Sequence, residues 1–269
     1  MKSKSLILSA VVALAGFLPQ SKASLVPLVS LGSAGRFAVL AGSTVTSTGP
    51  TTLNGNLGLW PGTSVTETPT MTVNGTRYIN DGVAQTAQGY LTTAYNDAAG
   101  RTPDATYVGG YNLALLTPVP NVGLSPGVYH DDSSFSLTGT LTLDAQNNPD
   151  AVWIFQAGST LTTAGSSHVE LINGAQACHV FWQVGSSATL GTDSDFVGNI
   201  LALTDITLTT GATVDGRVLA RNGAVTLDNN TITVPICVPE ASSFWPGACC
   251  ASLFAWQWLV VWRRKAGRS

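Results

Sequence analysis

The feature that most restricts the fold of this chain is a repeat in its second half. A short apolar run is followed by a turn and then by a threonine-rich run, and this pattern recurs along the chain. The apolar runs are 152–155, 180–182, 200–203 and 218–220, and the threonine-rich runs are 160–163, 188–192, 206–210 and 224–227. The first runs lie roughly 18 to 28 residues apart, which is the length of one coil of a solenoid. A single coil cannot bury its apolar side, whereas stacked coils share one continuous core. The repeat therefore predicts a mainly β chain built as a β-solenoid.

A ladder of leucines supports the stacking. Leu161, Leu190, Leu208 and Leu227 occupy matching places in the threonine-rich runs, and we expect them to form an inward column. A β-sandwich is the alternative, because it also uses short strands at regular spacing. The stepwise repeat favours the solenoid.

One helix interrupts the β pattern, at about 81–99. Small or apolar residues recur there at helical spacing and predict one buried stripe. Either Asn80 or Asp81 can cap its start, and Gly100 stands where a C′ glycine is expected. The stripe comprises Ala84, Ala87, Leu91, Ala94 or Tyr95, and Ala98. We interpret this helix as a packing element along the solenoid.

Charge and composition exclude several functions. Only 10% of the residues are charged, against roughly 25% in an ordinary soluble domain. The formal net charge is −3 and no basic patch occurs, so we expect no nucleic-acid partner. No CxxC motif or histidine-rich cluster suggests a metal, and nothing indicates a cofactor.

The first residues have the pattern of a signal peptide, over 1–23. Lys2 and Lys4 give a positive start, 6–18 is apolar, and 21–23 has small residues at the cleavage positions. A membrane anchor is the alternative, although the apolar run is short for a span. Export predicts an oxidising environment and a location outside the cell or on its surface.

The last residues, 238–269, form a second targeting segment. A short motif at 238–242 precedes an apolar stretch at 244–262, and 263–265 is basic. This order resembles the PEP-CTERM sorting tail that an exosortase processes, except that Ala241 stands where that signal usually has proline. A plain C-terminal membrane anchor is the alternative. Either one predicts membrane contact through the tail, transient if the tail is processed.

The body is then 24–237, and it contains two cysteines. Cys178 begins an apolar run and Cys237 ends the body, so in an exported protein we expect them to form a disulfide. Two buried free thiols are the alternative. Cys249 and Cys250 lie in the tail.

Several segments of the body resemble the DUF3494 ice-binding proteins. They are GRFAVLAGSTVTSTG (35–49), LTTAYNDAAGR (91–101), LSPGVYH (124–130), and the longer stretches 137–163 and 198–232. The resemblance implies a right-handed, discontinuous β-solenoid of triangular cross-section with one long helix along a side. It also implies adsorption to ice through one flat β face, which gives thermal hysteresis or inhibits ice recrystallisation. The segment 55–80 is short, so we expect no large capping insertion there.

Threonine chemistry is consistent with ice as the partner. Ice presents a periodic lattice of water, and threonine offers a hydroxyl and a methyl group on a side chain that is stiff at χ1. Some members of the family carry the motif T-(A/G)-x-(T/N) on the ice face, and stretches that match it or follow the ladder leucines supply candidates. The candidate ice-binding residues are Thr48, Thr51, Thr163, Ser166, Thr192, Ser194, Thr210, Thr213, Asn229 and Thr231. The alternative is that threonine only favours strands and that Thr-Gly pairs only mark turns.

Two other functions are alternatives to ice binding. An extracellular polysaccharide lyase needs clustered carboxylates, and Asp193 with Asp195 is the closest pair, although solvated turn residues explain it more simply. The histidines His130, His168 and His179 are scattered, so we expect no enzyme. A cell-surface adhesin or matrix protein, with the solenoid as a structural module, is the stronger alternative. We expect a monomer in each case.

Overall fold

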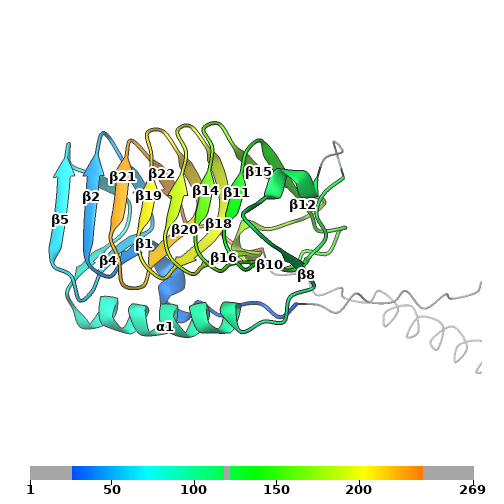
Figure 1. The fold of residues 1–269 in the computed structure, drawn as a ribbon. Helices are drawn as coiled ribbons and strands as arrows, with labels where there is room; N and C mark the ends of the chain where they lie inside the picture. The colour runs from blue at the N-terminus through cyan, green and yellow to red at the C-terminus, as the bar shows by residue number, and fades with distance from the viewer. Residues whose placement is uncertain (1–25, 118–121, 239–269) are drawn as a thin grey trace, which may run out of the picture.

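The computed structural model describes residues 26–117 and 122–238, and the predicted signal peptide (1–23) and all but the first residue of the predicted sorting tail (238–269) lie outside them. The described chain is a β-solenoid with one long helix along its side, as predicted (Figure 1). Every strand pairing between its coils is parallel. No helix in this part of the chain is long and apolar enough to cross a membrane.

Each coil contributes strands to three faces. The first, here called the ladder face, is a separate 8-stranded sheet in the order β5-β2-β21-β19-β17-β14-β11-β9. Its strands are β2 (Thr44–Thr48), β5 (Ser64–Thr68), β9 (Tyr111–Asn112), β11 (Phe135–Leu137), β14 (Leu161–Thr163), β17 (Ala188–Leu190), β19 (Ile206–Leu208) and β21 (Val225–Asp228).

The other two faces are joined by long strands that continue from one to the other. The helix face lies against the helix and contains β1 (Phe37–Ala41), β4 (Asn56–Leu59), β7 (Arg77–Ile79), β8 (Ala105–Tyr107), β10 (Gly127–Asp131), β13 (Trp153–Ala157) and β16 (Val180–Val184). The third face contains β3 (Thr52–Asn54), β6 (Thr72–Val73), β12 (Thr140–Asp144), β15 (His168–Ile172) and β22 (Thr231–Thr233). The strands β18 (Asp195–Ala202) and β20 (Thr213–Ala220) span both faces.

The order of coils in space differs from their order in sequence. Strand β1 pairs with β4 on one side and with β20 on the other, so the first coils stack on the last one. The helix then carries the chain from β7 at one end of the stack to β8 at the other (Figure 1). This arrangement is the discontinuous solenoid that the resemblance implied. Residues 55–80 complete an end coil, and no large cap occurs there.

The interior is filled by stacked side chains. The rings of Phe155 and Trp182 lie face to face with centroids 4.2 Å apart, and both side chains are fully buried. Leu190, Leu208 and Leu227 stack as expected, because their strands pair in that register. Leu161 was wrongly placed in this column: it pairs with Ala188, and the buried Thr163 precedes Leu190 instead.

The helix α1 (Gly82–Ala99) covers the helix face. Asp81 caps it by accepting hydrogen bonds from the backbone N–H groups of Val83 (3.0 Å) and Ala84 (2.8 Å). The predicted stripe is buried, and Gln88 is buried with it. Gly100 has a φ of −83° and does not adopt the left-handed conformation expected of a C′ glycine. The strands beneath are buried on both sides and therefore read as continuous apolar runs.

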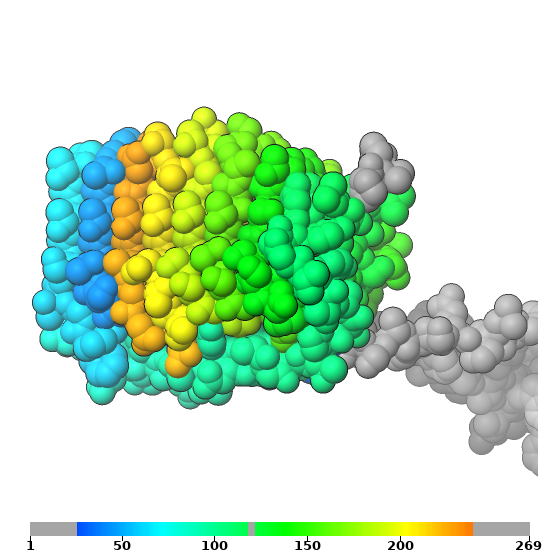
Figure 2. Space-filling model, viewed as in Figure 1, coloured from blue at the N-terminus to red at the C-terminus, as the bar shows by residue number. Residues whose placement is uncertain are grey.

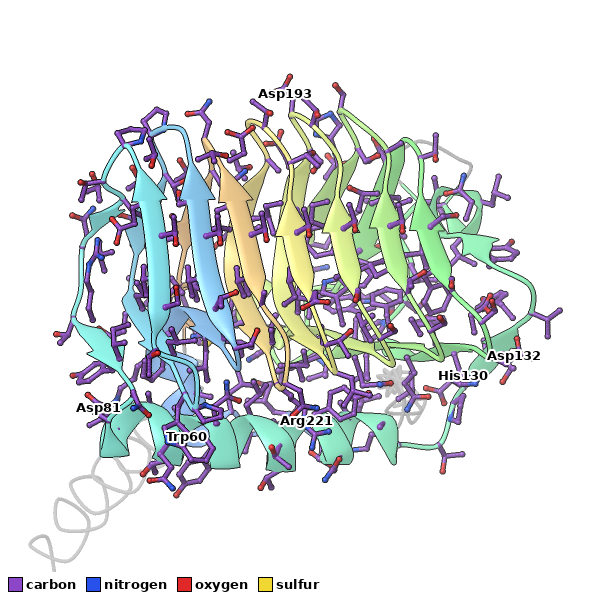
Figure 3. The ribbon with its side chains drawn as sticks, turned by 60° about the vertical axis from the view of Figure 1, so that its left-hand side comes forward. Trp60, Asp81, His130, Asp132, Asp193 and Arg221 are labelled. Carbon is purple, nitrogen blue, oxygen red and sulfur yellow. A yellow bond between two sulfur atoms is a disulfide. The ribbon has the colours of Figure 1, made fainter. Side chains whose placement is uncertain are left out.

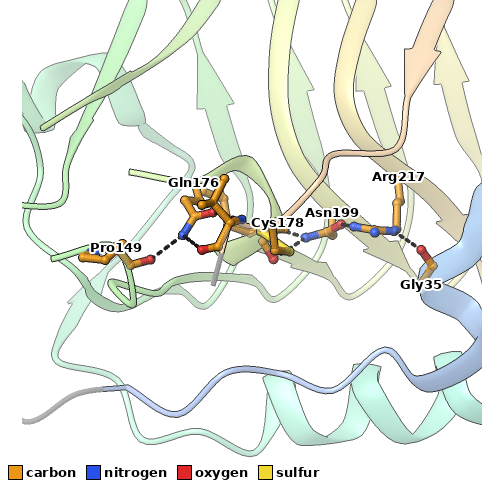
Figure 4. The surroundings of a disulfide bond; sticks show 9 residues. Gly35, Pro149, Gln176, Cys178, Asn199 and Arg217 are labelled. Atoms are coloured by element: carbon orange, nitrogen blue, oxygen red, sulfur yellow. Dashed lines mark hydrogen bonds between the residues drawn. A yellow bond between two sulfur atoms is a disulfide. The ribbon is translucent and has the colours of Figure 1, made fainter. Parts of the chain in front are cut away.

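The predicted disulfide joins Cys178 and Cys237. Cys178 lies in the 3₁₀ helix η3 (Ala177–His179), which leads into the helix face; two more such turns are η1 (Gly32–Arg36) and η2 (Leu113–Leu116). Beside the disulfide, Gln176 accepts a hydrogen bond from the Val238 backbone N–H (2.7 Å) and donates to the Pro149 carbonyl (2.8 Å) (Figure 4). The chain end is thus attached to the stack at several points.

A buried polar chain continues from the disulfide into the helix face. Asn199 donates to the carbonyl of Cys178 (3.2 Å) and accepts from Arg217 (2.6 Å), which also donates to the Gly35 carbonyl (2.8 Å) (Figure 4). Burial lowers the pKa of Arg217 to about 10. These bonds hold the segment before β1 against the last coils.

Candidate functional site: the ladder face

The ladder face carries one unbroken row of small polar side chains. Parallel register places one residue of each strand in this row, and side chains on either side of it in sequence point inward. From one end of the sheet to the other, the row is Thr66, Thr46, Thr226, Thr207, Thr189, Thr162, Ser136 and Asn112.

The row is accessible, and its members alternate along each strand with buried side chains. None of them is buried, while the flanking Val225 and Leu227, for example, are fully buried in the core. Neighbouring strands in a sheet are about 4.8 Å apart, and alternate residues along a strand about 6.7 Å, so the face presents a two-dimensional grid. The space-filling view shows the coils of this face as parallel columns across the molecule (Figure 2).

The central row contains no charged side chain. Carboxylates flank it at the edges of the face, where Asp205 accepts from the Ala224 backbone N–H (2.7 Å) and Asp228 accepts from the Thr210 hydroxyl. Because these carboxylates are bound to neighbouring coils, they support the edges of the grid. The middle of the face offers only hydroxyl, methyl and amide groups.

The third face has a shorter threonine row that charged residues interrupt. Thr72, Thr52, Thr231 and Thr213 are in register on adjacent strands. The row continues into Asp195 and His168, whose side chains lie 3.1 Å apart. The helix face is covered by α1, so among the described residues only the ladder face carries a long, exposed row without a charged side chain.

The structure places most of the predicted site residues at the corner between the ladder face and the third face. The backbone hydrogen bonds of the corner bring the predicted stretches together as neighbours, from Thr48 through Asn229, Thr210 and Thr192 to Ser166. Thr48 lies at the edge of the ladder face. Thr213 and Thr231 lie on the third face.

Backbone conformation explains this placement. Five neighbouring coils turn the corner through a residue with positive φ, and these residues stack on one another: Gly49, Asn229, Gly211, Asp193 and Ser166. Glycine, asparagine and aspartate tolerate this conformation best. The Thr-Gly pairs of the motif therefore mark the corner. This agrees with the alternative interpretation, in which such pairs only mark turns.

Three of the predicted residues are buried. Thr51, Thr163 and Ser194 are at most 3% exposed, so they have no surface for a flat external partner. They satisfy backbone groups instead: Thr163 accepts from the Gly191 N–H (2.8 Å) and Ser194 donates to the Gly191 carbonyl (2.7 Å). The residues of the central row were not among the predicted site residues, although residues 44–48 and 224–227 already show the alternation of outward and inward positions.

The carboxylates considered for catalysis have structural contacts. Asp193 is one of the corner residues, and Asp195 accepts from the Thr213 hydroxyl (2.7 Å) besides contacting His168. The end coil has an ion pair between Arg77 and Glu67, and the hydrogen bond from Arg77 lowers the pKa of the Glu67 carboxyl. Glu67 also accepts from the Met71 N–H (2.7 Å), so it secures the outer edge of the ladder face.

The corner gives a direct stability prediction. Asn230 is 1% exposed and donates to the carbonyls of Thr209 (2.9 Å) and Ala212 (3.0 Å). Replacing Asn230 with alanine leaves both carbonyls without this partner, and we expect a loss of about 2 kcal/mol in the free energy of unfolding, measured by denaturant titration. Asn229→Gly at the exposed neighbouring position is the control and should change stability by less than about 0.5 kcal/mol. Equal effects would contradict the role given to Asn230.

The fold and this face define a class of protein: a β-solenoid that presents a long, uncharged row of regularly spaced polar side chains, most of them threonines. A family model described as Ice-binding-like matches residues 39–233, and the chain belongs to that family.

Known relatives agree with this assignment. An ice-binding protein of Nostoc sp. (strain HG1) is 49% identical over 231 residues, which cover 86% of this chain and 82% of that protein. An ice-binding protein of Colwellia sp. is 37% identical over 221 residues, covering 77% and 84%.

Solved structures agree as well. The crystal structure of an ice binding protein from an Antarctic biological consortium superposes with a TM-score of 0.74 at 44% identity, covering 80% of this chain and 95% of that one. An ice-binding protein from the Antarctic ascomycete Antarctomyces psychrotrophicus gives a TM-score of 0.72 at 40% identity, covering 77% and 98%.

Proposed function

We propose that this protein adsorbs to ice through the ladder face. The observation that carries the proposal is the uncharged row from Thr66 to Asn112, which crosses the whole 8-stranded sheet in register. The ice-binding names of its relatives supply the nature of the partner.

The chemistry of the row suits a water lattice. Each threonine hydroxyl hydrogen-bonds water while its methyl group limits the water positions nearby, and the stiff χ1 torsion means that little side-chain entropy is lost on contact. Each contact is weak, so affinity comes from many contacts made at once by a rigid array. A flat sheet that is attached to a solenoid core provides that rigidity.

The third face is the less suitable surface. Its threonine row is interrupted by Asp195, whose carboxylate is strongly hydrated and costs free energy to bring against ice, and by His168 beside it. The names of the relatives likewise favour ice binding over the adhesin alternative. We propose no catalytic role.

The direct test is the growth of ice in the presence of the purified full-length protein. We expect faceted crystals and halted recrystallisation at micromolar concentration. Unmodified disc-shaped crystals together with ordinary grain growth would contradict the proposal. A negative result would not contradict the fold, because circular dichroism of the same sample measures its β content independently.

Ice activity should depend little on pH between 5 and 9. The central row contains hydroxyl and amide groups that do not titrate in this range, so we expect recrystallisation inhibition to stay within about twofold. The measurement is the inhibitory concentration at several pH values. A step within this range would show that a titrating group belongs to the ice-binding surface and would contradict the assignment to the central row.

We also propose that the protein is exported and acts as a monomer outside the cell or on its surface. The pattern of 1–23 supports export and that of 238–269 supports membrane contact with processing by an exosortase; both segments are assigned from sequence alone. The disulfide between Cys178 and Cys237 is consistent with an oxidising compartment.

A further inference from the structure

A groove of about 820 Å³ lies between helix α1 and the corner that joins the helix face to the ladder face. One wall is formed by helix residues at helical spacing, among them Gln85, Gln88 and Thr92. The other wall is formed by the corner loops of three neighbouring coils, which contribute Ser43, Trp60 and Arg221. Figure 3 shows Trp60 and Arg221 along the same side of α1. Coils about 4.8 Å apart give the groove a length of roughly 10 Å.

The groove holds a cation without a counter-charge. Among residues 26–117 and 122–238, Arg221 has no ion pair and no side-chain hydrogen bond, and its Nε atom is buried without a partner. Its guanidinium lies 4.6 Å from the centroid of the Tyr95 ring, which fixes its position. None of the residues that line the groove is acidic. A guanidinium held in this way is suited to a bidentate carboxylate.

The remaining lining offers the contacts that a sugar ring needs. Trp60 is partly exposed in the groove, and an indole face packs against the apolar face of a pyranose. Gln88 is 5% exposed, and its Nε2 donates to the Ala220 carbonyl (3.2 Å). Its Oε1 has no hydrogen-bond partner within the described part of the chain and is an acceptor for a sugar hydroxyl group. The exposed Gln85 and the partly exposed Thr92 add polar groups on the same wall.

A glycine in the middle of the helix keeps the groove open. A Cβ atom at Gly89 would meet no heavy atom within 4 Å, so packing against the protein does not require glycine there. Glycine inside a helix also costs stability relative to alanine. Gly89 lies in the groove wall, where a side chain would project into the open space, and this explains why glycine occupies the position.

We propose that this groove binds a short stretch of an acidic polysaccharide, with a uronate carboxylate on Arg221 and a sugar ring against Trp60. The site is separate from the ladder face, so the protein can hold an extracellular acidic polysaccharide while its ladder face is free. The proposal does not depend on ice binding, because it uses none of the residues of the central row.

The test is calorimetric titration of the full-length protein with trigalacturonate, a neutral galactose trimer, free galacturonate and a polyglutamate peptide. We expect saturable binding of trigalacturonate, at least tenfold tighter than the neutral trimer and the peptide. Absence of saturable binding would overturn the proposal. Equal binding of the peptide would overturn the assignment to a saccharide, and equal binding of free galacturonate would overturn the assignment to an oligomer.

Variants locate the site. Arg221→Gln should weaken binding of trigalacturonate at least tenfold. The affinity of Arg221→Lys should lie between those of the unmodified protein and the glutamine variant, since lysine keeps the charge without the bidentate geometry. Arg36→Gln is the matched control, because Arg36 is an exposed arginine outside the groove, and it should have no effect. Gly89→Ala should weaken binding while raising the melting temperature, which separates an obstructed groove from a damaged fold. Equal losses in the Arg221 and Arg36 variants would overturn the site. Ice activity should be unchanged in each variant.

Discussion

Replacing Thr226 with tyrosine should abolish most of the ice activity of this protein while leaving its melting temperature nearly unchanged. Thr226 is exposed on β21, near the middle of the ladder face, with Thr46 and Thr207 as its neighbours in the row. A tyrosine ring there stands above the face and separates several neighbouring side chains from the ice surface. We expect recrystallisation inhibition to fall at least about tenfold, which corresponds to about 1.4 kcal/mol or more of adsorption free energy.

The matched control is Thr231→Tyr. Thr231 is also exposed and follows Thr226 in the same coil, but it lies on the third face. This variant should keep its activity. If the Thr231 variant loses activity and the Thr226 variant keeps it, the ice-binding surface is the third face. If both are fully active, neither face binds ice.

Removal of the disulfide should cost about 4 kcal/mol in the free energy of unfolding, the largest single stability effect expected here. Cys178 and Cys237 are separated by 59 residues, and in the chain-entropy model a loop of that length gives a stabilisation of this size. The double variant Cys178→Ser/Cys237→Ser removes the crosslink without leaving a free thiol at either position. Denaturant titration at low temperature measures the change.

Two observations would test the assignment of this loss to the crosslink. A reducing agent should destabilise the unmodified protein by a similar amount and should not affect the double variant further. Ice activity of the folded double variant should persist in the cold, because Cys178 leads into β16 of the helix face and Cys237 follows β22 of the third face, so neither belongs to the ladder face. A loss below about 1 kcal/mol would show that the contacts of Gln176 already hold the chain end.

Local patterns predicted the elements well where the signal lies within one segment. The helix from Gly82 to Ala99 follows from its apolar stripe and from the cap at Asp81, both of which are contained in neighbouring residues. The disulfide between Cys178 and Cys237 was predicted because the body contains only these two cysteines. Gln88 was missed, since a polar residue next to an apolar stripe gives no indication that it will be buried.

The candidate site was predicted less well, because it depends on register between coils. The motif around Thr210 and Gly211 was interpreted as part of a flat face, yet Gly211 has a φ of +76° and turns the corner. The alternation that points Thr207 outward and Leu208 inward is visible in sequence, but it does not say which threonines of distant coils meet. Leu161 shows the same limit, since the length of each turn decides which residue it stacks on.

Patterns along the chain were enough to predict a solenoid, the place of its helix, the cysteine pair, and an outer surface that is rich in threonine and poor in charge. Those properties depend on the periods of apolar and polar residues and on local caps. Which threonines form one row depends on how the coils stack. Strand β2 is far from β21 in sequence and lies beside it in the sheet, so Thr46 meets Thr226 only because the first coils stack on the last. The same stacking placed Trp60 and Arg221 along one groove. Parallel pairing between distant segments leaves no local signal, and it is this pairing that creates both surfaces.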